Sequence, residues 1–478
     1  MKTSKLLFAV FAAGMFSCLT TACNNSNSKE EMEQYYNEVV KEISSEQYWG
    51  RSIYNDGAFK TADYIIDRLK SFGIAPCSYN TPQDTLAEVV GIFGPVGAVP
   101  KEIYDTIFPV TDPETDRYFQ KFAFNMNVMH NNAIFKVDGQ EWKPTVDYVF
   151  KEFSPTCEIK GEIVNFDDRD IYSKEKFVKT LNSGAYKDKF VLLDYDRFIE
   201  VFGADGQEPY KAAILPLTKV GGVIFEYDHR PGFFKSRSSY NTPCPVVAVQ
   251  KPFPRIAGNA YVKIDAAMHT YAGRNIIAEI PGTEITDKYN VIFAHYDHLG
   301  VMGKDNVFYG ANDNASGVAM VLSLAKYYSQ PHNKPKQSIL FIFWDAEEAN
   351  LLGSWYYTAN PIFPLENISF IADFDMIGDA ALSHEEEVLH VQVSTGAVPY
   401  YESLKKMNTK HQWFKEIVVE DLCDDSDNYP FDIKGVPTIY FSIDGQYYKH
   451  YHSPRDCYDN SSSANFSSLF EFCTKTIK

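Results

Sequence analysis

The sequence predicts an α/β protein with a functional site at the ends of its central strands, and two observations support this. First, apolar runs at 291–294, 338–344 and 368–372 have the character of buried strands, and each leads into a histidine or acidic residues. Second, helical patterns occur before and between these runs, most clearly at 56–72 and 318–328. Ligands of open α/β sheets bind at the carboxyl ends of the strands, so the polar residues are expected to meet there.

The first residues have the composition of an export signal. The chain begins with the basic segment Met1–Lys5, and Leu6–Phe16 is an apolar core that is too short to span a bilayer. We therefore predict that residues 1–22 form a signal peptide and that the protein is exported to the cell envelope.

Cys23 directly follows this signal. Small residues precede it in Leu19–Cys23, and the arrangement resembles a bacterial lipoprotein cleavage site, in which the cysteine becomes the lipidated N-terminus. The resemblance predicts a lipid anchor in a bacterial membrane at Cys23 and a polar tether over residues 23–30. Thr20 stands where such signals prefer an aliphatic residue, so a soluble secreted or periplasmic protein is the alternative.

Length and charge limit the classes of function. A chain of 478 residues exceeds one typical domain, so two domains are expected. The sequence has 63 acidic and 45 basic residues, for a formal net charge of −18. Nucleic-acid binding requires a basic face, so the composition argues against a nucleic-acid partner. The oligomeric state is left open.

The larger domain begins well before the C-terminal polar segments. Helical periodicity covers 31–43 and 56–72, and 119–126 is typical of a strand. We therefore assign residues 31–130 to the N-terminal part of a domain that resumes at 274–478.

Residues 131–273 predict a β-rich insert in that domain. One helical pattern at 204–217 lies among short strand-like runs, which are 161–166, 189–194, 221–225 and 243–249.

A histidine and two aspartates are grouped around the first apolar run. Side chains alternate along a strand, so His295 and Asp297 are expected on the same face. Asp297 can then hold the outer ring nitrogen of His295 while the inner nitrogen binds a metal. The Gly/Asn/Ser-rich loop 310–317 is expected to place the Asp313 carboxylate near the same strand end, and a carboxylate can bridge two cations.

Five segments, taken together and in order, resemble the motifs of the co-catalytic zinc exopeptidases of peptidase family M28, of the bacterial leucyl aminopeptidase and aminopeptidase Y kind. They are H-x-D at 295–297, G-A-N-D-N-A-S-G at 310–317, D-A-E-E-x-x-L-L-G-S at 345–354, D-M-I-G at 375–378 and Y-H-S-x-x-D at 451–456. Gly50–Arg51 also resembles the family's N-terminal segment. The resemblance implies a three-layer α/β/α sandwich with a mixed central sheet, and a cis peptide bond between Asp313 and Asn314.

Carried over residue by residue, the resemblance implies two zinc ions at one site. The five implied ligands are His295 and Asp375 for one ion, Glu348 and His452 for the other, and Asp313 as the bridge. Each ion would have three protein ligands and an open position, which is the catalytic arrangement of zinc. Glu347 would act as general base toward the attacking water, and Asp297 would orient His295.

Two segments that resemble the family also depart from it. The loop 425–431 aligns with a substrate-site segment that commonly reads S-D-H in relatives, so Asp427, Asn428 and Tyr429 are predicted to bind substrate, with Asn428 in place of the histidine. Asp379 stands where relatives often carry arginine. Both departures lie close enough to the predicted cleft to alter substrate choice.

The insert is similar in its order of strands and helix to the protease-associated domain that many of these peptidases carry. The similarity implies that the insert covers or shapes the mouth of the cleft. A passive insertion is the alternative.

The main hypothesis is an exported aminopeptidase that removes N-terminal residues from peptides. The alternatives are a glutaminyl cyclase-like acyltransferase with a single zinc, a carboxypeptidase of the same family, and a receptor ectodomain without catalysis. The presence of both His295 and Asp375 favours two metals over the cyclase. Because no implied ligand is missing, the non-catalytic class is disfavoured.

Six cysteines follow Cys23, and none forms a C-x-x-C pair; they are Cys77, Cys157, Cys244, Cys423, Cys457 and Cys473. Free thiols are one interpretation. An exported protein can also form disulfides, and Cys423 with Cys457 is the pair to test first because both flank the predicted site.

Overall fold

The computed structural model describes most of the chain beyond the signal segment. The described residues are 23–52, 56–77, 88–91, 94–98, 106–108, 112–129, 133–166, 173–202, 219–228, 231, 242–253, 258–302, 305–378, 388–443 and 449–477. The predicted signal 1–22, the predicted helix 204–217 and Asp379 lie outside this set.

A mixed sheet of 11 strands forms the centre of the larger domain among these residues. In spatial order its strands are β20 (Glu416–Glu420), β19 (Val388–Val393), β21 (Thr438–Ser442), β18 (Ile368–Phe374), β14 (Ile285–His295), β17 (Gln337–Trp344), β13 (Ala266–Ile280), β4 (Phe119–Met129), β2 (Glu88–Gly91) and β3 (Gly94–Ala98), with β1 (Ala75–Pro76) paired to β13. β14 runs parallel to β17 and β18, whereas β13 runs antiparallel to β17 and β4.

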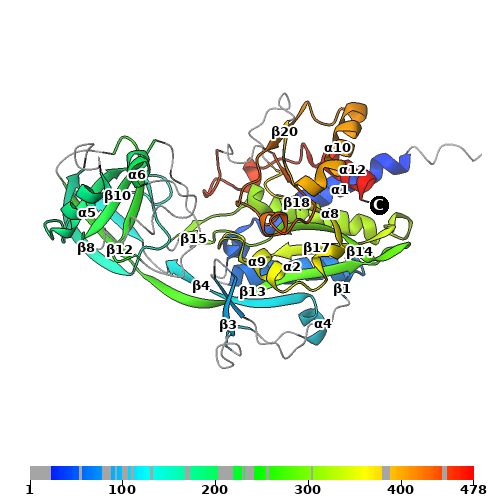
Figure 1. Ribbon diagram of the computed structural model, residues 1–478, viewed down its shortest axis with the longest axis horizontal. Helices are drawn as coiled ribbons and strands as arrows, with labels where there is room; N and C mark the ends of the chain where they lie inside the picture. The colour runs from blue at the N-terminus through cyan, green and yellow to red at the C-terminus, as the bar shows by residue number, and fades with distance from the viewer. Residues whose placement is uncertain are drawn as a thin grey trace, which may run out of the picture.

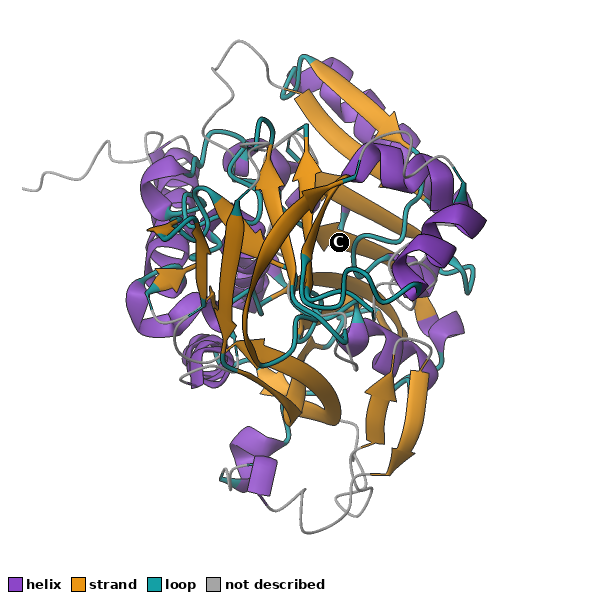
Figure 2. Cartoon of the chain, turned by 90° about the vertical axis from the view of Figure 1, so that its left-hand side faces the viewer, coloured by secondary structure: helices purple, strands orange, loops and turns teal. Residues whose placement is uncertain are grey.

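Helices cover both faces of this sheet, which confirms the predicted α/β/α sandwich with a mixed sheet. On one face lie α1 (Cys23–Ile43), α2 (Gly57–Ser71), α8 (Gly317–Ser329), α10 (Val398–His411) and α12 (Phe466–Thr476); on the other lie α9 (Leu352–Ala359) and α11 (Tyr429–Asp432). Along β17, Phe341 and Phe343 pack toward the first layer, while Ile342 and Trp344 pack toward the second. A central strand buried on both faces requires the nearly continuous apolar run seen in the sequence. Figure 2 shows helices on both sides of the strands.

The N-terminal tether prediction is wrong in its conformation. α1 begins at Cys23, eight positions before the start predicted from periodicity, so the segment 23–30 is helical. Two ion pairs hold the early turns against the domain: Lys29 with Glu471 at 3.6 Å, and Glu31 with Lys326 at 3.1 Å. Farther along, the buried face of α1 packs on α8. This packing stabilises the helix, including its polar first turns.

The insert forms a second sheet of eight strands among the described residues. Its strands are β6 (Gln140–Glu141), β5 (Ile134–Val137), β12 (Asn259–Ile264), β8 (Cys157–Asn165), β9 (Phe190–Asp194), β10 (Gly222–Tyr227), β11 (Val246–Gln250) and β7 (Tyr148–Phe150). Two helices, α5 (Lys174–Asn182) and α6 (Tyr195–Phe202), occur where the sequence suggested none. Figure 1 shows this unit at the opposite end of the molecule from α1 and α12.

A long two-stranded ribbon joins the insert to the main sheet. β13 begins at Ala266, which pairs with Met129 of β4, and the pairing continues to Ile276 opposite Phe119. The predicted C-terminal boundary of the insert at residue 273 is therefore too late, because residues 266–273 already belong to the ribbon. The short helix α4 (Pro113–Asp116) precedes β4.

The insert also packs directly on a loop of the larger domain. The hairpin of β15 (Val301–Met302) and β16 (Asn306–Val307) lies in this loop. Leu299, Met302 and Phe308 are buried in one apolar cluster with side chains of the insert, including Phe177 and Phe225. The core of the insert is therefore continuous with residues that stand between His298 and Asp313 in the sequence.

The six cysteines after Cys23 are all free thiols, so the suggested Cys423–Cys457 disulfide is wrong. The Cys423 thiol instead donates to Asp425 at 2.9 Å. Among the described helices, no segment has the length and apolar character needed to cross a membrane.

Candidate metal centre

Three neighbouring strands bring acidic and histidine side chains to one edge of the main sheet. β18, β14 and β17 are adjacent and parallel, so their carboxyl ends meet. β14 ends at His295, β17 leads into Glu347 and Glu348, and β18 leads into Asp375. The sheet topology thus gathers side chains that are up to 80 positions apart in the sequence.

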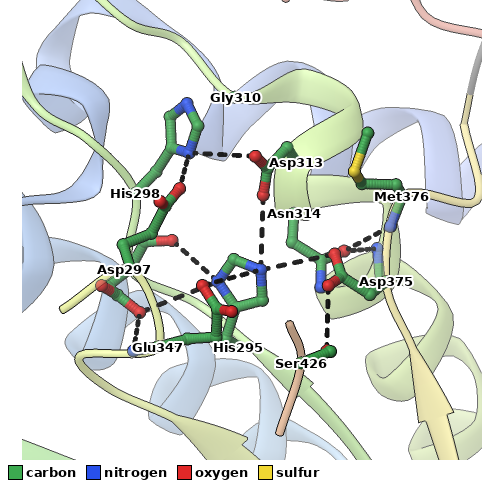
Figure 3. Close-up of polar contacts among 12 residues, drawn as sticks. His295, Asp297, His298, Gly310, Asp313, Asn314, Glu347, Asp375, Met376 and Ser426 are labelled. Atoms are coloured by element: carbon green, nitrogen blue, oxygen red, sulfur yellow. Dashed lines mark hydrogen bonds and ion pairs between the residues drawn. The ribbon is translucent and has the colours of Figure 1, made fainter. Parts of the chain in front are cut away.

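Two loops add the remaining predicted ligands. Asp313 lies in the irregular turn η3 (Ala311–Ser316) directly before α8, and His452 lies in the loop after β21. Asp313 Oδ1 is 3.3 Å from His295 Nε2, and Asp313 Oδ2 is 3.2 Å from His452 Nε2. Figure 3 shows Asp313 directed toward His295. The peptide bond between Asp313 and Asn314 is cis, as the resemblance implied.

The five side chains form two groups of three that share Asp313. Asp375 Oδ1 is 3.4 Å from His295 Nε2, and Glu348 Oε2 is 3.5 Å from His452 Nε2. Two ligands bound at about 2.0–2.1 Å to a tetrahedral ion lie about 3.3 Å apart. The four separations between a histidine nitrogen and a carboxylate oxygen match that geometry.

The chemistry of these side chains fits a metal site. All five are buried, and Asp375 Oδ1 has no hydrogen-bond partner among the described residues. Burial raises the pKa of Asp375, which shows the cost of placing its charge there. Burial alone would lower the pKa of His295, but the Glu347 and Asp375 carboxylates raise it well above its usual range. Imidazole nitrogens and carboxylate oxygens of this kind are zinc ligands.

Residues 275–477, which carry all of these side chains, match the family described as Peptidase family M28. This part of the chain is an M28 domain. The match includes β14, β17, β18 and both loops of the site, and it leaves out the insert and the N-terminal helices.

Curated relatives match the M28 domain over short stretches. Leupeptin-inactivating enzyme 1 of Streptomyces exfoliatus is 41% identical over 109 residues, which cover 22% of this chain and 23% of that protein. A probable lipoprotein aminopeptidase of Mycobacterium tuberculosis is 35% identical over 123 residues, covering 25% and 23%. A vacuolar membrane protease of Pyrenophora teres is 31% identical over 118 residues, covering 22% and 12%. The chain therefore matches less than a quarter of the length of these relatives.

Solved structures share the fold over nearly the whole chain, insert included. A zinc aminopeptidase from Bacillus subtilis superposes with a TM-score of 0.60 at 16% identity, covering 93% of this chain and 94% of that one. A peptidase M28 precursor from Shewanella amazonensis gives a TM-score of 0.61 at 17% identity, covering 95% and 96%. At these identities the likeness shows the fold alone.

Glu347 lies at the edge of the two groups in the M28 domain. Its carboxylate Oε2 is 3.9 Å from His295 Nε2, a longer separation than those of the five predicted ligands. Burial and the neighbouring Glu348 carboxylate raise the pKa of Glu347 well above its usual range. The structure therefore sets Glu347 beside the two groups without making it the closest neighbour of either histidine.

Asp297 has a different geometry from the one expected. Its backbone carbonyl is 3.2 Å from His295 Nδ1, whereas its carboxylate Oδ1 is 3.7 Å away. The same Oδ1 accepts the backbone N–H of Glu347 at 3.0 Å. Asp297 thus contacts His295 mainly through its main chain, and its carboxylate fixes the turn that carries Glu347.

Two supporting residues received no role from the sequence. The Arg51 guanidinium is fully buried and donates to main-chain carbonyls of the segment after β14 and of the loop that carries Asp313, which are those of Tyr296, Tyr309, Gly310 and Asp313. The Asp456 carboxylate accepts the backbone N–H groups of Asn312 and Asp313 at 2.8 and 3.0 Å. Arg51 and Asp456 were noted only as parts of motifs.

Further neighbours of the ligands were also missed. Ser426 Oγ lies 3.0 Å from Asp375 Oδ2, so that Oδ1 is left facing His295. The Tyr451 ring stacks on His452 with 3.6 Å between ring centroids. Burial and nearby carboxylates, including Asp313, raise the pKa of the Tyr451 phenol.

The predicted substrate loop has mixed surroundings. Asp427 is buried, accepts a hydrogen bond from Ser354, and has its pKa raised to about 7 by burial. Asn428 is fully buried, and its amide donates to Asp432 at 2.8 Å, away from the two groups. Tyr429 is half-buried and makes an edge contact with Trp355. Asn428, which replaces the histidine of relatives, therefore supports the loop and does not face the two groups.

Proposed function

We propose that this protein is an exported aminopeptidase that uses two zinc ions to hydrolyse N-terminal residues from peptides. The position of Asp313 carries the proposal, because its two carboxylate oxygens lie 3.3 and 3.2 Å from different histidines. A bridging carboxylate has that arrangement. The Mycobacterium tuberculosis relative is named a probable lipoprotein aminopeptidase and the similar Bacillus subtilis structure is that of a zinc aminopeptidase, and both names support the proposal.

In this proposal His295 and Asp375 hold one ion, Glu348 and His452 hold the other, and Asp313 is shared. Two zinc ions bound there would acidify a water molecule and polarise the peptide carbonyl. The main chain of this site is held by Arg51, and Asp375 is oriented by Ser426. Such neighbours keep ligand side chains in the geometry that a metal requires.

Glu347 is the proposed general base. Its carboxylate lies beside the two groups, and burial raises its pKa, which is the direction that favours proton acceptance by a general base. It would take the proton of the attacking water and deliver it to the leaving amine. Asp297 holds the backbone of Glu347 in place for that transfer.

The substrate peptide is proposed to contact the loop that carries Asp427 and Tyr429. The insert, which resembles a protease-associated domain, is proposed to shape the cleft and to support the loop between His298 and Asp313. Its shared apolar cluster with Leu299, Met302 and Phe308 supports the second role. A passive insertion would not need to contribute to the packing of a ligand-bearing loop.

Export and lipid anchoring at Cys23 are also part of the proposal. They rest on the signal-like N-terminus and on the name of the Mycobacterium tuberculosis relative, a probable lipoprotein aminopeptidase. The catalytic domain would then act next to a bacterial membrane without entering it.

A comparison of substrates tests the proposed activity. The purified protein, supplied with zinc, is assayed with a free-amine peptide, its N-acetylated form and its C-terminally amidated form. An aminopeptidase cleaves the first and third and spares the second. Cleavage that requires a free carboxyl terminus would identify a carboxypeptidase. Cyclisation of N-terminal glutamine with one zinc per chain would identify the cyclase-like alternative.

A further inference from the structure

His298 lies beside one of the two adjacent glutamates of the site. Its Nδ1 is 2.6 Å from Glu348 Oε1, and both side chains are buried. His298 comes directly after Asp297, in the segment that follows β14, and Figure 3 shows its ring close to Asp313. No role follows for it from the five ligands and the base.

The distance indicates a hydrogen bond instead of a shared metal ion. Two donors on one tetrahedral zinc are about 3.3 Å apart. A separation of 2.6 Å is too short for that and is close to the length of a charge-assisted N–H···O bond. His298 Nδ1 is also 3.8 Å from Asp313 Oδ2, farther than His452 Nε2 at 3.2 Å. His452 therefore completes the second group, and His298 lies outside that group in contact with its Glu348 carboxylate.

We propose that His298 is a positioning residue that selects Glu348 as the ligand of the second zinc. Its Nδ1–H donates to Glu348 Oε1, so Oε2 is the oxygen that faces His452 at 3.5 Å. The inference rests on the proposed two-zinc function. It also gives a physical reason why two neighbouring glutamates differ.

Glu347 lacks an equivalent donor. The described structure shows no hydrogen bond to its carboxylate, and its closest histidine nitrogen, His295 Nε2, is 3.9 Å away. A carboxylate without a fixed hydrogen-bond donor can rotate toward water. The carboxylate of Glu348, in contrast, is held in place through its Oε1. The pair is thereby divided into a mobile proton acceptor and a fixed ligand.

The His298 ring is itself held in place. Its backbone N–H donates to the Arg51 carbonyl at 3.2 Å, and the next residue, Leu299, is buried in the cluster shared with the insert. The other ring nitrogen, Nε2, is buried and has no partner among the described residues. Among the described residues, Glu348 is therefore the side chain to which this imidazole is hydrogen-bonded.

Zinc binding to three variants of the metal-free, full-length protein tests the inference. His298→Leu removes the donor at similar volume. His298→Asn keeps an N–H group at the position of Nδ1. His332→Leu, at an exposed histidine outside the site, is the matched control. Zinc affinity is measured by chelator competition and calorimetry, cobalt absorption spectra report ligand geometry, and thermal unfolding of the metal-free forms reports the fold.

We expect His298→Leu to weaken the second zinc by about 10- to 100-fold while the first is bound as in the wild type. His298→Asn should recover most of the affinity and the wild-type cobalt spectrum. Wild-type affinity in His298→Leu would overturn the inference. Equal loss in the Asn and Leu variants, with both folded, would overturn it in favour of direct ligation by His298. Failure of the wild type to bind a second ion would instead overturn the two-zinc function itself. If His298→Leu does not fold, the Asn variant alone decides between donor and ligand.

Discussion

The Arg51 guanidinium donates to the backbone carbonyl of Asp313 at 2.9 Å, across 262 positions of sequence. The same side chain donates to carbonyls at 296, 309 and 310, so one buried cation joins the segment after β14 to the loop that carries Asp313. Burial lowers the pKa of Arg51 to about 10, and the nearby Asp313 carboxylate acts in the opposite direction. Arg51 is therefore charged at neutral pH while being fully buried.

Arg51→Lys should destabilise the protein and loosen the site. A lysine keeps the charge but offers donors from a single nitrogen, so it cannot reach the carbonyls of both the segment after β14 and the Asp313 loop. Each buried carbonyl left without a partner costs about 1–3 kcal/mol, so a loss of at least about 3 kcal/mol is expected. Thermal unfolding and zinc affinity are measured together, with the exposed Arg117→Lys as the matched control. A stable variant with unchanged zinc affinity would contradict the role given to Arg51.

Glu347→Gln and Glu348→Gln should fail in different ways. If Glu347 is the base, its variant keeps both zinc ions and loses about two to four orders of magnitude in turnover. Glu348→Gln should weaken one zinc, because a neutral amide is a poor substitute for a carboxylate ligand, and excess zinc should restore part of its activity. Metal analysis beside kinetics on the same preparations distinguishes them. Equal zinc loss in both variants would show that base and ligand are assigned wrongly.

The insert should contribute to metal binding through Phe308. This ring is fully buried in the cluster that joins the insert to the loop before Asp313. Phe308→Ala should cost about 3–5 kcal/mol of stability and should also lower zinc affinity. The exposed Val146→Ala, within the insert, is the control and should change neither. Lost stability with wild-type zinc affinity would make the insert a passive attachment.

Lipid anchoring depends on Cys23. Wild-type protein expressed in a bacterial host should partition with membranes, and Cys23→Ala should shift the processed protein to the soluble fraction. Mass spectrometry of the mature N-terminus accompanies the fractionation. A soluble wild-type protein that begins downstream of Cys23 would favour the secreted alternative.

The order of strands and ligands was predictable because it is local information. Each strand of the site is an apolar run that leads into a histidine or acidic residues, so the sequence around each run predicts polar side chains at that edge. The family resemblance then implied that His295, Glu348 and Asp375 are ligands. The cis bond and the bridging position of Asp313 followed from the family resemblance. Arg51, Asp456 and His298 were not predictable, because their partners are set by tertiary packing between segments that are 50 or more positions apart.

Other differences between the predictions and the structure have similar causes. The segment 23–30 is polar and has no helical periodicity of its own, but ion pairs from Lys29 and Glu31 to other helices hold its helix in place. The ribbon over 266–273 was assigned to the insert because strand composition does not reveal which sheet a strand joins. Cys423 and Cys457 flank the site in the sequence, but the Cys423 thiol turns to Asp425.

The central claim is that two zinc ions share the Asp313 carboxylate, and anomalous diffraction at the zinc edge from crystals of the zinc-loaded protein tests it most directly. We predict two peaks about 3.5–4 Å apart, one beside His295 and Asp375 and the other beside Glu348 and His452, with Asp313 between them. A single peak, or two peaks that do not share Asp313, would contradict the account.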